Sequence, residues 1–235
     1  MKKTIKAIAA LTLLTASTLS HAGRYDWIAE SVQPVADVIT KAENKVSSAM
    51  GAPKASEANA DLPSITSKGH ANCDSIPLPP GSTLDVGFSP EGTAEAKVVK
   101  AIREASAGKG EHSIRMAAYE FTSWPVAKAL VAAKDAGVKV AVVVDAKENQ
   151  KKASKVSYLV GHGIPVRMDS SIAMLHDKAI IINSDTVELG SFNYTAAAAS
   201  AEHAENAVIL RHAPAVAACY AVHWRKLWEQ STPVK

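Results

Sequence analysis

Four polar side chains of types that suit phosphate chemistry lie close together in one stretch of the sequence. His176 and Lys178 are two residues apart, and Ser191 and Asn193 follow Gly190. Residues two apart in a strand project to the same face, so the imidazole and the ammonium would emerge side by side. An imidazole attacks phosphorus, an ammonium neutralises oxyanions, and a hydroxyl and an amide hold them. The stretch therefore predicts a site that acts on a phosphate group.

The same stretch predicts a β-hairpin that would position these groups. Its first strand would begin at His176 and carry Ile180 and Ile182 inward on the same face. The chain would return from Val187 and end at 190–191, where glycine permits a close backbone approach and a helix is expected to start nearby. The four polar groups would then converge at one edge of a sheet.

The spacing H-x-K-x4-D-x6-G-S-x-N resembles the motif that defines the phospholipase D superfamily, with Asn183 at the D position. The resemblance extends from about Val86 to Trp228, and in particular the chain is similar to small secreted bacterial endonucleases with one motif per chain. It includes Val-Gly-Phe-Ser-Pro at 86–90, Phe-Thr-Ser at 121–123 and Glu-Asn-Ala-Val at 205–208.

The resemblance implies a hydrolysis that needs no metal or other cofactor and passes through a covalent phosphohistidine. His176 would attack phosphorus, the histidine of a second motif would protonate the leaving oxygen, and water would then release the phosphate. Of the eight histidines in the sequence, only His176 is followed by a lysine two positions later. The second motif would therefore come from another copy of the chain, in a homodimer with its active site on the two-fold axis.

Two further residues take their roles from this resemblance. Glu205 matches the carboxylate that accepts a hydrogen bond from the nucleophilic imidazole; the alternative is an exposed strand carboxylate. Asn183 departs from the family's aspartate. Because it is expected at the hairpin turn, where either side chain bonds nearby backbone amides, we expect weaker organisation rather than loss of a reacting group. Serious impairment of catalysis is the alternative.

Apolar strands alternate with amphipathic helices from Leu84 onward. This order predicts an α/β fold, a mainly parallel or mixed sheet flanked by helices, in a catalytic domain at 82–231. Strands are expected at 113–119, 138–145 and 164–167, and helices from Ser89, at 124–135 and at about 149–160. A strand, helix, strand order implies a parallel pair with a right-handed crossover.

The N-terminal part of the sequence predicts export. The first 22 residues combine three lysines, an apolar run from Ile8 to Leu19 and Ser-His-Ala at 20–22, which is typical of a signal peptide cleaved after Ala22. The run is shorter than the ~20 residues that span a bilayer; an uncleaved anchor is the alternative. We expect a periplasmic or secreted protein. Residues 23–81, interrupted by prolines, predict a largely irregular extension that acts as a tether.

The two cysteines, Cys73 and Cys219, would then lie in an oxidising compartment. That location favours a disulfide that ties the N-terminal extension to the C-terminal helix, with two unpaired thiols as the alternative. The number and spacing of the cysteines predict no metal site.

Charge alone does not identify the substrate. Without the three lysines of the signal peptide, 23 basic residues face 23 acidic ones, so the mature chain is neutral although the full sequence has a pI of about 8.7. Nucleic acid and phospholipid both contain phosphodiesters. Four lysines follow the strand at 138–145, where α/β sheets place ligand-binding loops: Lys147, Lys151, Lys152 and Lys155.

These lysines would follow a phosphate backbone, and an ordinary solvated helix face is the alternative. The sequence contains no amphipathic stretch strong enough to indicate a lipid surface. We therefore expect a nuclease. Phospholipid hydrolysis and a nonhydrolytic DNA-binding or cell-surface protein are the alternatives.

Overall fold

The computed structural model describes residues 73–107 and 112–235. The predicted signal peptide, its cleavage point after Ala22 and most of the predicted extension at 23–81 lie outside the described residues. From Cys73 to Ser82 the chain is irregular, and it leads directly into the first strand.

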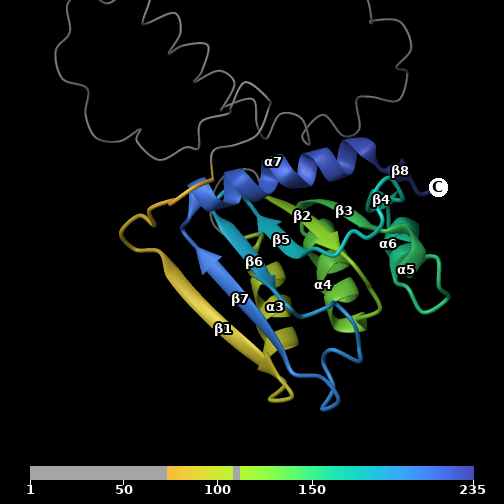
Figure 1. The fold of residues 1–235 in the computed structure, drawn as a ribbon, viewed down its shortest axis with the longest axis horizontal. Coiled ribbons are helices and arrows are strands. Elements are labelled where there is room, and N and C mark those ends of the chain that lie inside the picture. The colour runs from red at the N-terminus through yellow and green to blue at the C-terminus, as the bar shows by residue number, and fades with distance from the viewer. Residues whose placement is uncertain (1–72, 108–111) are drawn as a thin grey trace, which may run out of the picture.

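The described residues form one eight-stranded mixed sheet with helices on both faces (Figure 1). The strands lie in the order β1-β7-β6-β5-β2-β3-β4-β8. In chain order the elements are β1 (Thr83–Ser89), α3 (Thr93–Glu104), β2 (Ser113–Ala118), α4 (Trp124–Asp135), β3 (Lys139–Asp145), α5 (Ala146–Asn149), α6 (Val156–Gly161), β4 (Val166–Asp169), β5 (Lys178–Ile182), β6 (Thr186–Gly190), β7 (Glu205–Arg211), α7 (Pro214–Gln230) and β8 (Thr232–Pro233).

The parallel part of the sheet is confined to β2, β3 and β4, which are joined by helical crossovers. The other neighbouring strands pair antiparallel. The predicted α/β fold is confirmed, and the sheet is mixed. The strand registers bring the C-terminal ends of β2, β3 and β6 to the same edge as the starts of β5 and β7.

Alternate residues of the central strands pack against helices on opposite faces, as the two-residue period of a strand requires. Met116 and Val142 belong to the core shared with α3 and α4, whereas Ala117 and Val143 belong to the core shared with α7. In Figure 1, α7 lies across the sheet from α3 and α4. The central strands are thus buried on both faces, and their ends meet at one edge of the sheet.

The helix at 124–135 has the predicted bounds, because Ser123 caps it: the Ser123 Oγ accepts a hydrogen bond from the backbone N–H of Val126 at 3.1 Å. The helix predicted from Ser89 begins instead at Thr93, since β1 continues along β7 through residue 89. A Cβ at Gly87 would lie 2.6 Å from the Thr93 carbonyl oxygen, so glycine allows β1 to approach α3.

Two other predicted elements are wrong in part. The single helix expected at about 149–160 is wrong over its first half: α5 ends at Asn149, residues 150–155 form turns, and in the rest of that range only α6 is helical. The Asn149 side chain makes tertiary contacts where α5 ends. Its amide accepts a hydrogen bond from the Phe121 N–H at 3.1 Å and donates to the Tyr119 carbonyl at 2.7 Å. The helix expected to start near Asn193 is also absent from the described residues, where 194–204 form turns and irregular backbone.

Candidate active site

The predicted reacting groups lie at the sheet edge where β2, β3 and β6 end and where β5 and β7 begin. His176 lies in the exposed segment before β5 rather than in the predicted strand, and Lys178 is the first residue of β5. The Lys178 side chain is largely buried, and its ammonium donates a hydrogen bond to the His176 backbone carbonyl at 2.7 Å. An accessible imidazole therefore lies next to a covered ammonium.

Tyr119, the residue after β2, contacts both side chains. Its ring packs edge-to-face against the His176 imidazole, with 4.7 Å between the ring centroids. The Lys178 Nζ lies 5.2 Å from the centroid of the same tyrosine ring. The backbone N–H of Tyr119 donates to the Asp177 carbonyl at 3.0 Å, which ties the end of β2 to the segment that carries the imidazole.

The pKa of the Lys178 ammonium is lower than its ordinary value. Burial lowers this pKa, and the carboxylates of Asp177 and Glu205 oppose the effect only in part. A charge shielded from water interacts more strongly with an anion than an exposed one does. Lys178 is therefore placed to stabilise negative charge that develops beside His176.

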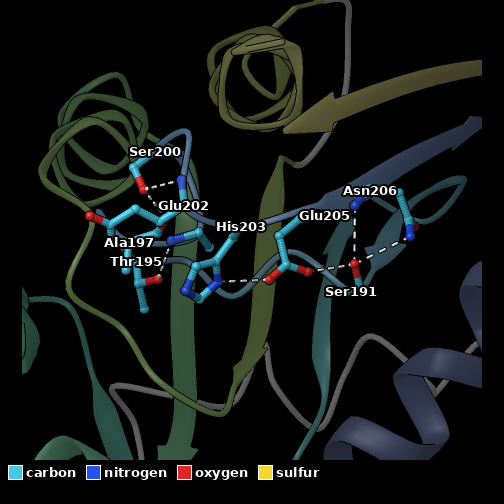
Figure 2. Close-up of polar contacts among 9 residues, drawn as sticks. Ser191, Thr195, Ala197, Ser200, Glu202, His203, Glu205 and Asn206 are labelled. Atoms are coloured by element: carbon cyan, nitrogen blue, oxygen red, sulfur yellow. Dashed lines mark hydrogen bonds and ion pairs between the residues drawn. The ribbon is translucent and has the colours of Figure 1, made fainter. Parts of the chain in front are cut away.

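Ser191 and Glu205 lie at neighbouring strand ends and contact each other directly (Figure 2). The Ser191 Oγ donates to the Glu205 Oε2 at 2.6 Å and accepts from the Asn206 backbone N–H at 3.0 Å. The Glu205 Oε1 lies 3.1 Å from the His203 Nδ1. Within one chain, Glu205 thus has Ser191 and His203 as partners. Its predicted contact with the imidazole of His176 stays a prediction.

Gly190 is the residue that allows this arrangement. A Cβ at this position would lie 2.2 Å from the carbonyl oxygen of Asn206, closer than any side chain permits. The close approach lets the backbone N–H groups of Ser191 and Phe192 both donate to that carbonyl, each at 3.1 Å. Gly190 therefore allows the end of β6 to approach β7 closely, and this approach fixes the position of Ser191.

Asn193 lies between two fully buried aromatic residues, Phe192 and Tyr194. The Oδ1 of Asn193 is buried and has no hydrogen-bond partner among the residues that the structure describes. An unpartnered buried acceptor costs about 1–3 kcal/mol, and such groups occur at binding and catalytic positions. Asn193 is therefore a candidate binding position, and its role stays a prediction.

Sequence comparison identifies the family. The model of the family "Cardiolipin synthase, PLD-like domain" matches residues 98–228, more than half of the chain. The chain belongs to the phospholipase D-like family. A phospholipase D from Rickettsia conorii is 39% identical over 102 residues, which are 43% of this chain and 50% of the relative. A mitochondrial cardiolipin hydrolase from Mus musculus is 25% identical over 158 residues, 67% of this chain and 69% of the relative.

Solved structures show the same fold. Nuc from Salmonella typhimurium, a phospholipase D family member, is 42% identical, with a TM-score of 0.61 over 66% of this chain and 99% of Nuc. NucT from Helicobacter pylori is 19% identical, with a TM-score of 0.57 over 65% of this chain and 99% of NucT. The chain spans about half the length of the curated Rickettsia phospholipases that it matches.

In this phospholipase D-like chain, Asn183 lies at the opposite end of β5 from Lys178. Its Nδ2 donates to the Ala105 carbonyl at 3.2 Å, and its Oδ1 accepts from the Ser113 N–H at 3.0 Å. Its φ of 55° is in the left-handed region that asparagine tolerates. Asn183 is at the hairpin turn, as predicted, and these side-chain hydrogen bonds are made to backbone groups of Ala105 and Ser113.

The structure places the four predicted lysines after β3, at the edge that carries the site, with Lys147, Lys151 and Lys152 exposed. Lys151 forms an ion pair with Glu148, and this contact reduces its availability to a substrate. The Lys155 ammonium lies 4.4 Å from the centroid of the Trp124 ring. The lysines therefore do not act as one uniform basic patch.

Cys73 and Cys219 form a disulfide that joins the segment before β1 to α7. Residues 73–107 and 112–235 contain no cluster of three or more His, Cys, Asp or Glu side chains that would hold a metal ion. None of the helices in these ranges has the length and apolar character needed to cross a membrane.

Sequence reasoning assigned no role to Tyr119 or His203. The position of Tyr119, directly after a buried strand at the predicted ligand-binding edge, was the signal available for it. His203 lies two residues before Glu205, a spacing that allows two side chains to share a face. The partner of Tyr119 could not be identified in this way, because His176 is 57 residues further along the chain.

Proposed function

We propose that this protein is an exported, metal-independent phosphodiesterase that cleaves nucleic acid through a phosphohistidine on His176. The observation that carries the proposal is the accessible imidazole of His176 held against Tyr119, with the Lys178 ammonium over the same tyrosine ring. A nucleophile beside a preorganised cation suits displacement at phosphorus.

The reaction consists of two displacements. An imidazole nitrogen of His176 attacks phosphorus, a P–N bond forms, and the P–O bond to the leaving group breaks as His176 of the partner subunit gives its proton to the leaving oxygen. That second imidazole then takes a proton from water, whose oxygen attacks phosphorus and breaks the P–N bond. The products are an alcohol and a phosphate monoester, and both imidazoles return to their starting states.

The other motif residues have supporting roles in this proposal. Lys178 and Asn193 bind the non-bridging phosphate oxygens through an ammonium and an amide. Glu205 accepts a hydrogen bond from an imidazole and stabilises its cationic form. Ser191 orients Glu205 through the 2.6 Å hydrogen bond between them.

An apolar strip on β1 supports the homodimer. Leu84, Val86 and Phe88 alternate along this edge strand and are 59%, 37% and 49% exposed. Phe88 pairs with Asn206, next to Glu205, so the strip runs up to the site. A second copy that covers the strip would bury apolar area and bring a second His176 towards the first. Phe88→Asp is expected to give an inactive monomer in light scattering and activity assays; a fully active monomer would exclude the shared site.

Lys147 and Lys152, which are exposed after β3 at the edge that carries the site, favour nucleic acid as the substrate, because ammonium groups beside the site neutralise phosphates. Phospholipid is the second candidate. Ile172 and Met174, in the segment that leads to His176, are 43% and 51% exposed and would contact a lipid surface. Several relatives are also named phospholipase D.

The test uses the mature chain, residues 23–235, and His176→Ala. Each protein is incubated in EDTA with plasmid DNA, RNA and phosphatidylcholine vesicles, and acid-labile phosphoprotein is then measured. DNA or RNA cleavage with trapped phosphohistidine, by the parent protein alone, is expected. Hydrolysis of lipid alone supports the phospholipase. A dimer that binds DNA without turnover, unchanged by His176→Ala, means that the protein is a nonhydrolytic binder.

Export has a separate test. The disulfide between Cys73 and Cys219 suits an oxidising compartment. Expression of the full chain in a Gram-negative host is expected to yield periplasmic protein whose N-terminal residue is Gly23. Cytoplasmic protein that retains residues 1–22 contradicts the prediction.

A further inference from the structure

An exposed tryptophan lies near the proposed site and is surrounded by cations. Trp124, the first residue of α4, is 47% exposed. The Lys155 Nζ lies 4.4 Å from the centroid of its ring, and the Lys128 Nζ lies 5.9 Å from it. Lys128 is four residues further along α4 and therefore shares its surface with the indole. Neither the motif nor the proposed reaction gives this cluster a role.

The backbone around Trp124 is tied to the motif. The N–H groups of Thr122 and Ser123 both donate to the Tyr194 carbonyl at 2.9 Å, and Tyr194 directly follows Asn193. The Lys155 N–H donates to the Phe121 carbonyl at 2.9 Å. The indole and its nearer cation thus come from two segments that a backbone hydrogen bond joins at the edge that carries the site.

The indole is also held by a neighbouring ring and follows the residue that contacts His176 by a short stretch of chain. Tyr158 packs against Trp124 edge-to-face, with 5.0 Å between ring centroids. Tyr119, which contacts His176, precedes Trp124 by five residues, so their Cα atoms are separated by at most about 18 Å. This span corresponds to about five nucleotides at the ~3.4 Å rise per nucleotide of one stacked strand.

A preorganised, half-exposed indole between ammonium groups matches the composition of sites that bind single-stranded nucleic acid, where bases stack on aromatic rings and cations contact the phosphates. A purely structural tryptophan would bury most of its surface. A lipid surface is the competing interpretation, because lysines beside an exposed tryptophan also suit anionic headgroups. Glu95, held by Ser123 through a 2.6 Å hydrogen bond, leaves the cluster with a net positive charge.

We propose that Trp124, with Lys155 and Lys128, forms a subsite on which an unpaired base of a single-stranded nucleic acid stacks, within about five nucleotides of the reacting phosphate. The proposal rests on the proposed nuclease function and specifies its substrate: single strands, or duplexes with locally unpaired bases. A base in an intact duplex is already stacked and paired, and it gains nothing from the indole.

The experiment measures binding without turnover, in His176→Ala protein. Fluorescence anisotropy with oligothymidine of about 16 nucleotides is compared with an equally long duplex, at ~0.1 M salt. Adding Trp124→Ala is expected to weaken single-strand binding about 5- to 150-fold, the range that corresponds to ~1–3 kcal/mol of stacking, and to leave duplex binding within about threefold. Trp124→Phe, which keeps a π-face, is expected to restore most of the affinity.

Charge and folding controls accompany the binding measurement. Lys155→Ala is expected to reduce the slope of log affinity against log salt by about one, whereas Lys134→Ala, at the far end of α4, should leave that slope unchanged. Thermal unfolding of each variant establishes that it is folded before binding is compared.

Three outcomes overturn the inference in distinguishable ways. Equal single-strand affinity with and without Trp124 removes the subsite and leaves the nuclease proposal intact. Failure of the His176→Ala protein to bind DNA or RNA in any form removes both. Binding to phosphatidylglycerol vesicles that depends on Trp124, with no such dependence for oligothymidine, assigns the cluster to a lipid surface.

Discussion

The hydroxyl of Tyr194 donates a hydrogen bond to a carboxylate oxygen of Glu188 at 2.5 Å, and both side chains are buried. Burial raises the pKa of Glu188 to about 8, although the hydrogen bond from Tyr194 acts in the opposite direction. Burial also raises the pKa of Tyr194, and the neighbouring Glu188 adds to this effect. Because Tyr194 follows Asn193 and holds the segment before α4, this pair supports one side of the site.

The raised pKa of Glu188 predicts a stability that falls as pH rises. An unfolded glutamate releases its proton near pH 4.5, whereas the folded chain holds it until about pH 8. The contribution of this group is therefore complete below about pH 4.5 and is lost progressively up to about pH 8. Glu188→Gln, which stays neutral, should gain stability relative to the parent over that window. Urea unfolding of both proteins at about pH 5 and about pH 9 tests this; parallel pH dependences would disprove it.

Restoring the family aspartate at position 183 is expected to cost stability without changing the reaction. The Asn183 Nδ2 donates to the Ala105 carbonyl, and a carboxylate there can only accept hydrogen bonds. We expect Asn183→Asp to lower the free energy of unfolding by about 1–2 kcal/mol. The measurements are urea unfolding and kcat on a phosphodiester. An increase of more than about tenfold in kcat would instead mean that position 183 acts on the reaction.

His203 is expected to act as a positioning residue for Glu205. Its Nδ1 lies 3.1 Å from the Glu205 Oε1. We expect His203→Ala to lower kcat several-fold with little change in KM, since Glu205 would lose one of its two partners. His203→Asn, whose Nδ2 occupies nearly the same place as the imidazole Nδ1, should recover most of the loss. If His203→Ala raised kcat instead, the hydrogen bond from His203 would be competing with His176 for the carboxylate of Glu205.

The disulfide is expected to contribute strongly to stability. Cys73 and Cys219 are separated by 146 residues. In the chain-entropy model, closing so long a loop lowers the entropy of the unfolded chain and raises the free energy of unfolding by up to about 5 kcal/mol. Thermal unfolding with and without a phosphine reductant should therefore show a marked fall in Tm on reduction. The double variant Cys73→Ser/Cys219→Ser provides the control, because its lower Tm should not respond to the reductant.

Local patterns in the sequence were sufficient for much of the fold. The helix at 124–135 has a capping serine before it and Gly137 after it, with φ of 91°, so its ends are encoded by nearby residues. The break between α5 and α6 could not be predicted in the same way. It follows from the contacts of Asn149 with Tyr119 and Phe121, about 30 residues away in the chain.

The sequence by itself determined which groups we propose for the chemistry. His176, Lys178, Ser191 and Asn193 are recognisable from side-chain type and spacing, because a hairpin keeps residues close in sequence close in space. The tertiary structure alone decided what surrounds them. Tyr119 reaches His176, and Ser191 reaches Glu205, because β5 pairs with β2 and β6 pairs with β7. Strand order depends on how the whole core is buried, and no local spacing encodes it.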